Sequence, residues 1–191
     1  MTSRPTRRGL LACWAGLGLV GCLGTDEEPP EQARTDWPSH DGTDAETIPH
    51  TYDCDGVCGM NPASYPEWHA QLAHDDGTGA FFCSTGCLLS YVAVPDHTGA
   101  RDADVTGVWV RDVRTVEWTD GMAAHWVLET DTDEQQPGEP MELNPRPFQD
   151  PADASAYVDD RDQLAADAIV AFEDLDHEIA HRYRSSRLPA P

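Results

Sequence analysis

The sequence predicts an α+β fold of two related halves, in which strands are followed by a helix in each half. Three observations lead to this prediction. Short segments rich in β-branched and aromatic residues alternate with Gly and Asp turns, several segments place apolar residues at helical spacing, and the order of strands and helix occurs twice. The chain has 191 residues, enough for one domain or for two small similar halves.

The first half is predicted to contain a strand pair and a helix. Residues 68–73 alternate apolar and polar side chains, residues 75–77 mark a turn, and residues 80–82 predict a short return strand. Residues 84–92 carry apolar side chains at helical spacing, so we expect a helix there.

The second half begins with three segments that are rich in β-branched and aromatic residues and bounded by Gly or Asp. These predicted strands span residues 105–113, 116–118 and 123–128. Asp150 followed by Pro151 is a typical helix start, with Asp as N-cap and Pro as first helical residue, and predicts a helix over 151–158. A last strand is expected over 168–172 and a closing amphipathic helix over 174–184.

The N-terminus is predicted to be an export signal. An uncharged run over residues 9–21 follows three arginines, and it is too short to cross a bilayer. The arginine pair within residues 6–11 fits a twin-arginine signal. Residues 19–22 resemble a lipobox, in which Cys22 is acylated after removal of the signal; the alternative is a plain cleaved signal with an incidental cysteine. We therefore expect a lipid-anchored, extracellular protein on the outer face of the cytoplasmic membrane.

The remaining chain is divided by composition. Residues 22–50 are rich in Pro and acidic residues with little apolar periodicity, so an acidic disordered tether is expected there. The folded domain is expected over residues 51–184, with halves at about 51–100 and 104–184. Residues 185–191 are expected to form a flexible tail because they are polar and contain prolines.

Charge excludes some functions. Asp and Glu number 35 against 12 basic residues, all of them Arg, and the formal net charge is −23. A protein that binds nucleic acid without sequence preference needs cations to displace counterions from phosphates, so no nucleic-acid partner is expected. The excess of acidic residues is typical of a protein adapted to high salt, that is, a halophilic one.

Four cysteines of the expected domain predict a metal site. Cys54 and Cys58 form one pair, Cys83 and Cys87 form another, and Met60 follows the first pair closely. Thiolate and thioether ligands select soft ions such as Cu(I) or zinc, and a thioether in particular favours Cu(I).

Two other interpretations of these cysteines stay open. An exported chain meets oxidising conditions that favour disulfides, although Cys83 and Cys87 at helical spacing are too far apart for an unstrained bridge. Two Cys pairs also resemble a treble-clef structural zinc site, but both pairs have three residues between the cysteines, where two are commoner.

Catalysis has little support in the sequence, so we expect no enzyme and no catalytic residue. The H-E-x-x-H motif over residues 177–181 has no His, Asp or Glu after it to complete a zinc protease site. A nucleophile elbow and phosphate-binding glycine loops are missing from the sequence.

Several motifs give the chain a specific resemblance. It resembles the NosL family, copper-binding lipoproteins that assist assembly of nitrous oxide reductase, and looks like a haloarchaeal-type member. The likeness covers about residues 54–175 and rests on Cys58-Gly59-Met60-Asn61-Pro62, Gly86-Cys87-Leu88-Leu89-Ser90-Tyr91, Val108-Trp109-Val110-Arg111-Asp112 and Pro140-Met141. The resemblance implies two ββαβ-type halves and a lipoprotein signal.

The resemblance also implies Cu(I) binding and delivery. Cys58 and Met60 match the Cys-x-Met motif of the family, and Met141 matches a methionine of its second half, with apolar packing as the alternative role for Met141. Many bacterial relatives carry acidic residues before the glycine-cysteine step, whereas this chain has Phe82-Cys83-Ser84. This stretch is similar to small metallochaperone domains of the TRASH and YHS kinds, so Cys83 is expected to be an added ligand. The candidate ligands are, in order, Cys58, Met141, Met60, Cys87, Cys83 and Cys54.

The function expected from the sequence is that of an exported, lipid-anchored Cu(I) metallochaperone. Its expected partners are nitrous oxide reductase, the maturation ABC-transporter complex of that enzyme, and the membrane through the lipid anchor. The alternatives are a zinc-stabilised, treble-clef-like interaction module and a surface thiol-disulfide protein that uses Cys83 and Cys87.

Overall fold

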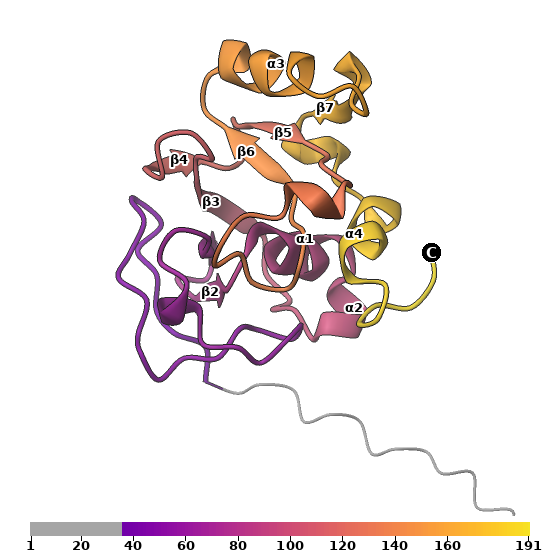
Figure 1. Cartoon of the computed structure of the whole chain (residues 1–191). Coiled ribbons are helices and arrows are strands. Elements are labelled where there is room, and N and C mark those ends of the chain that lie inside the picture. The colour runs from indigo at the N-terminus through magenta and orange to yellow at the C-terminus, as the bar shows by residue number, and fades with distance from the viewer. Residues whose placement is uncertain (1–35) are drawn as a thin grey trace, which may run out of the picture. The chain divides into compact units, whose positions relative to one another are not determined.

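The computed structural model describes residues 36–191, which form two antiparallel sheets with helices packed around them (Figure 1). The predicted signal peptide, the lipidation site Cys22 and the first part of the predicted tether lie outside the described residues. Within the described part of the chain, no helix combines the length and the apolar character needed to span a membrane.

The first sheet has the strand order β2-β1-β3-β4 and is antiparallel throughout. Its strands are β1 (Ala70–His74), β2 (Gly79–Phe82), β3 (Val105–Arg111) and β4 (Trp118–Asp120). Leu72 pairs with Ala80 on one side and with Val108 on the other, so β1 lies in the middle of the sheet. The helix predicted over 84–92 is confirmed as α1 (Thr85–Ala93), and the short α2 (Pro95–Thr98) follows it.

The second sheet has the order β6-β5-β7 and is also antiparallel. Its strands are β5 (His125–Val127), β6 (Arg146–Phe148) and β7 (Ile169–Val170). Strand β6 was not predicted from the sequence, because an Arg and a Pro interrupt its apolar pattern. Short 3-10 turns occur at Pro62–Ser64, Thr132–Glu134, Ala166–Ala168 and Phe172–Asp174.

Both longer helices of the second half begin at an acidic cap. The predicted start of α3 (Pro151–Asp159) is confirmed, because the Asp150 side chain accepts a hydrogen bond from Ala152 N at 2.8 Å. Helix α4 (His177–Arg184) begins three residues later than predicted, where the Asp176 side chain accepts from Ile179 N at 2.9 Å.

The two sheets share one topology. Each half runs strand, strand, helix, strand, and in each the third strand returns antiparallel to the first, as in β1-β2-α1-β3 and β5-β6-α3-β7. The α+β fold with two ββαβ-type halves is therefore confirmed. The predicted boundary between the halves, near residues 100–104, is wrong because β3 belongs to the first sheet and β4 extends the same sheet.

A common core joins the two halves. Trp126 of β5 is fully buried in the same apolar cluster as Leu72 and Val108 of the first sheet. The indole Nε1 of Trp126 donates a hydrogen bond to Gly121 O at 2.9 Å, so its polar atom is satisfied inside this core. Helix α4 packs against α1 beside this cluster (Figure 1).

The prediction that the tether continues to residue 50 is wrong for residues 36–50. Ser39 forms a β-bridge with Thr78, and the side chains of His40 and Ile48 are buried. Gln71 holds this segment: its Nε2 donates to Glu46 O at 3.0 Å, and its Oε1 accepts from Glu46 N at 2.9 Å and lies 3.0 Å from His40 Nε2. Hydrogen bonds to the buried amide therefore order a segment that lacks apolar periodicity.

The prediction of a flexible tail at residues 185–191 is also wrong. Leu188 is buried in an apolar cluster with Leu89 of α1 and Ile179 of α4. The ring of His97 hydrogen-bonds Arg187 O at 2.8 Å. The buried Leu188 side chain and contacts to the backbone hold this short segment on the domain.

Replacement of Gln71 by Ala is expected to lower the free energy of unfolding by about 1–3 kcal/mol, because buried polar groups of His40 and Glu46 lose their partner. Denaturant unfolding checks this, and proteolysis should cleave within 36–50 faster in the variant. Gln135→Ala, at an exposed position, is the control. Equal stability of Gln71→Ala and the unchanged chain would contradict the role of Gln71.

Candidate metal centre

The first cysteine pair lies on a tight loop that is docked on β2. Asp55 N donates to Phe81 O at 3.4 Å, and Phe81 N donates to the Asp55 carboxylate at 3.2 Å. Gly56 adopts a left-handed conformation, and a Cβ there would collide with the carbonyl of Thr98. Cys54 N donates to Met60 O at 2.7 Å and closes the loop. The loop thus presents the Cys54 and Cys58 sulfurs beside the end of β2.

The second cysteine pair lies where β2 leads into α1. Cys83 directly follows β2, Ser84 is the N-cap of α1, and Cys87 lies in the first helical turn. Cys87 N donates to Ser84 O at 3.2 Å, so the start of the helix fixes the direction of the Cys87 side chain. Both side chains are fully buried.

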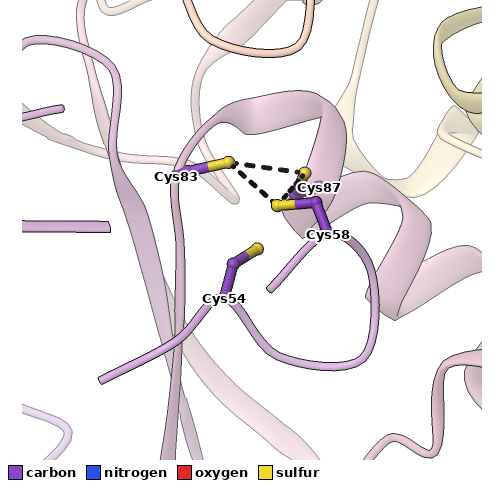
Figure 2. Close-up of side chains that lie close together, drawn as sticks. All are labelled: Cys54, Cys58, Cys83 and Cys87. Carbon is purple, nitrogen blue, oxygen red and sulfur yellow. Dashed lines mark hydrogen bonds between the residues drawn. The ribbon is translucent and has the colours of Figure 1, made fainter. Parts of the chain in front are cut away.

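The four sulfurs converge on one point (Figure 2). The Cys58, Cys83 and Cys87 sulfurs form a triangle with edges of 3.4, 3.7 and 3.8 Å. Cys54 directs its sulfur toward this triangle, and all four sulfurs lie within 4.8 Å of one another. A metal ion bound tetrahedrally by sulfur at about 2.3 Å requires sulfur separations of about 3.8 Å, so the triangle has the size of a metal site.

The four thiols are free, so the structure contains no disulfide among the cysteines of residues 36–191. The shortest separation within the triangle, 3.4 Å between the Cys58 and Cys83 sulfurs, is well beyond the length of a disulfide bond. The geometry favours a ligand set over an oxidised pair.

The cluster thiols differ in pKa because their surroundings differ. Burial raises the pKa of Cys54 well above the ordinary thiol value. Side-chain hydrogen bonding with the other three thiols lowers the pKa of Cys87 well below that value, and the positive charge of Arg184 adds to the effect. The pKa of Cys58 is lowered by hydrogen bonds from Cys54 and Cys83. Because thiolates are the metal-binding form, Cys87 and Cys58 are the best prepared to bind an ion.

The two predicted methionine ligands lie against the same core. Met60 and Met141 are partly buried and pack on the apolar cluster that contains Cys54, Cys83 and Cys87. Met141 adopts a left-handed backbone conformation, as does the next residue, Glu142. Ligation by either thioether remains a prediction.

A second group of candidate ligands lies in the N-terminal segment but is already engaged. His40, Asp41 and Glu46 bring an imidazole and two carboxylates within 4.8 Å of one another. His40 Nδ1 accepts a hydrogen bond from Gly42 N at 3.1 Å, while Nε2 faces the amide oxygen of Gln71. The ring therefore offers no free lone pair, and its role is to attach the segment to the sheet.

The H-E-x-x-H motif shows no metal-binding arrangement. His177 Nε2 hydrogen-bonds Pro189 O at 3.0 Å, so this histidine helps to hold the C-terminal segment in place. Among the described residues, the groups of three or more Cys, His, Asp or Glu ligands do not include His177 or His181.

One residue of the site was missed by sequence reasoning. Arg184, the last residue of α4, is 2% exposed and reaches the start of α1. Nothing in the periodicity of α4 distinguishes it from the exposed basic residues expected at a helix C-terminus. Only the packing of α4 on α1 shows that its guanidinium lies inside the protein.

The fold and site define an α+β protein with a largely buried four-thiol cluster of the kind that soft metal ions select. The model of the NosL family matches residues 46–180, so the chain belongs to the NosL family. The fold is similar to that of the copper chaperone NosL from Shewanella denitrificans, whose crystal structure has a TM-score of 0.53 and 20% sequence identity. That similarity covers 70% of this chain and 96% of the other. No protein of curated function matches the chain.

In the reduced, metal-free protein, Cys58 is expected to react first with an alkylating reagent. It is the only half-exposed thiol among residues 36–191, and its lowered pKa leaves more thiolate at neutral pH than an ordinary thiol has. Mass spectrometry of digested samples checks the order of labelling, and the Cys58 rate should level off at a lower pH than that of a free thiol. Cys54, on the same loop but buried, is the internal control; labelling of Cys54 before Cys58 would refute the assignment.

Proposed function

We propose that this protein is a metallochaperone that binds Cu(I) at the four-thiol cluster and passes it to an acceptor outside the cell membrane. The observation that carries the proposal is the convergence of four free thiols, three of them with sulfur separations of 3.4–3.8 Å. Membership of the NosL family and the copper chaperone with a similar fold support copper as the ion.

The ligand chemistry suits a carrier rather than an enzyme. Thiolates bind Cu(I) strongly, and Cu(I) is stable with two or three sulfur ligands, so one position can be exchanged. Cys54, Cys83 and Cys87 are buried, whereas Cys58 is partly exposed. An incoming ligand from an acceptor can therefore replace Cys58 first while the buried sulfurs still hold the ion.

The location and partners are part of the same proposal. The arginine-bearing signal and the lipobox at residues 19–22 support export and a lipid anchor at Cys22. The acceptor we propose is nitrous oxide reductase together with its maturation ABC-transporter complex, on the basis of the family. The anchor would confine delivery to the outer face of the cytoplasmic membrane.

Structural zinc is the second candidate, and the number of thiols favours it. Four cysteines form a closed tetrahedral site in many structural zinc proteins, where zinc contributes to folding. The low exposure of three of the four sulfurs is compatible with this role. A zinc site would leave the partly buried Met60 and Met141 without a function in binding.

Anaerobic titration of the reduced chain in high salt, with a competing chelator for each ion, separates the two candidates. We expect one equivalent of Cu(I) to bind tightly and to displace zinc without loss of the fold. Cys58→Ser should weaken Cu(I) binding about tenfold or more while leaving thermal unfolding nearly unchanged, because Cys58 is half-exposed. Zinc that Cu(I) displaces only on unfolding would rule out the chaperone.

Substitutions at two methionines test whether the Met141 thioether binds Cu(I). Met141→Leu keeps the size and apolar character of the side chain but removes the sulfur, so it should weaken Cu(I) binding while leaving zinc binding unchanged. Met122→Leu, at an exposed turn position, is the matched control and should change neither. Identical Cu(I) affinity in the two variants would assign Met141 to packing alone.

A further inference from the structure

The guanidinium of Arg184 is a buried charge surrounded by neutral groups. Its Nη1 donates to the backbone carbonyl of Leu143 at 3.1 Å and of Met141 at 3.3 Å, and its Nη2 donates to Ser84 Oγ at 2.8 Å and to the Asn144 side chain. Within residues 36–191, no carboxylate lies at ion-pair distance from it. A buried cation without an anion is costly, so the protein needs a negative group nearby.

A second buried arginine, Arg146, has its charge neutralised by a carboxylate, as is usual for buried charges. Arg146 of β6 is 1% exposed and forms a bidentate ion pair with Glu139, with nitrogen–oxygen distances of 2.7 and 2.8 Å. Asn144 donates to the same carboxylate at 2.8 Å, so Glu139 is already fully engaged. Arg184 and Arg146 are thus comparable in burial but differ in their counter-charge.

The position of Arg184 identifies the missing anion. Its Nη2 lies against the first turn of α1, where a Cβ on Gly86 would collide with it, and Cys87 is the next residue. Asn144 Oδ1 links the guanidinium to the same turn by accepting from Gly86 N at 3.3 Å. The thiol cluster thus adjoins the turn that contacts Arg184, and its thiols become negative when they bind a metal ion.

We propose that Arg184 is the counter-cation of the thiolate cluster and a positioning residue for the bound metal ion. The inference rests on the proposed function, because two or more thiolates around Cu(I) leave a net negative charge inside the protein. Arg184 offsets that charge across the interface of the two halves, and its bonds to the carbonyls of Met141 and Leu143 fix the loop that carries the candidate thioether.

The charge and the hydrogen bonds of Arg184 can be separated by two substitutions. Arg184→Lys keeps the charge but loses the forked geometry, and Arg184→Gln loses both. We expect the two variants to be destabilised to a similar degree, but Arg184→Gln should bind Cu(I) about tenfold or more weakly than Arg184→Lys. The affinity is measured anaerobically with a competing chelator, and stability by thermal unfolding of the metal-free chain.

Arg146 provides the matched control. Arg146→Lys and Arg146→Gln also remove a buried guanidinium, but the partner of Arg146 is the Glu139 carboxylate and not the thiol cluster. Both variants should therefore lose stability, and the two should bind Cu(I) with equal affinity. Equal affinity of Arg184→Lys and Arg184→Gln would overturn the proposal and leave Arg184 a structural role. Failure of the unchanged chain to bind Cu(I) would instead overturn the proposed function.

A further variant keeps the test decisive if Arg184→Gln does not fold. Ser84→Asp places a carboxylate against the guanidinium. The Ser84 hydroxyl bonds to Arg184 and makes no capping bond to α1, and Asp is a favoured residue at an N-cap position, so the helix start is retained. The new carboxylate would compete with the thiolates for the cation, so Cu(I) affinity should fall about tenfold with the helix retained. Affinity equal to that of the unchanged chain would contradict the counter-cation role.

Discussion

The four-thiol cluster depends on the pairing of the Cys54–Cys58 loop with the edge of β2. Two hydrogen bonds attach the loop: Asp55 N donates to Phe81 O, and Phe81 N donates to the Asp55 carboxylate. The Tyr52 hydroxyl donates to the same carboxylate. Without this attachment, two cysteines would lie on a free loop and two on a helix start. The hairpin of β1 and β2 supplies the rigid edge, so the geometry of the sulfurs derives from sheet hydrogen bonds.

The halves share a topology but not a chemistry. The cysteines belong to the first half, whereas the second contributes Met141 and the buried guanidinium of Arg184. Trp126 joins the two sheets in one core, and α4 brings its last residue to the start of α1. This division explains why a domain with two copies of a small unit has a single thiol cluster among its described residues.

Much of this arrangement could be predicted from the sequence, and the failures have physical causes. Apolar periodicity and the Asp150 cap identify most elements, and the cysteine spacing identifies the four thiols that the fold brings together. Residues 36–50 were misjudged because Gln71 hydrogen bonds, not an apolar stripe, order them. Strand β6 was missed because the burial of Arg146 depends on Glu139, and the role of Arg184 depends on contacts 100 residues apart in the chain.

The uneven exposure of the thiols bears on the kinetics of transfer. Three of the sulfurs are enclosed and Cys58 is partly exposed, so an ion bound by the cluster would be reached most easily beside Cys58. Spontaneous release into water would require several enclosed sulfur bonds to break together. If the protein transfers an ion as proposed, exchange would follow an associative route, in which the acceptor binds before the ion leaves this protein. The rate of that transfer would rise with the concentration of the acceptor, and little free ion would escape in its absence.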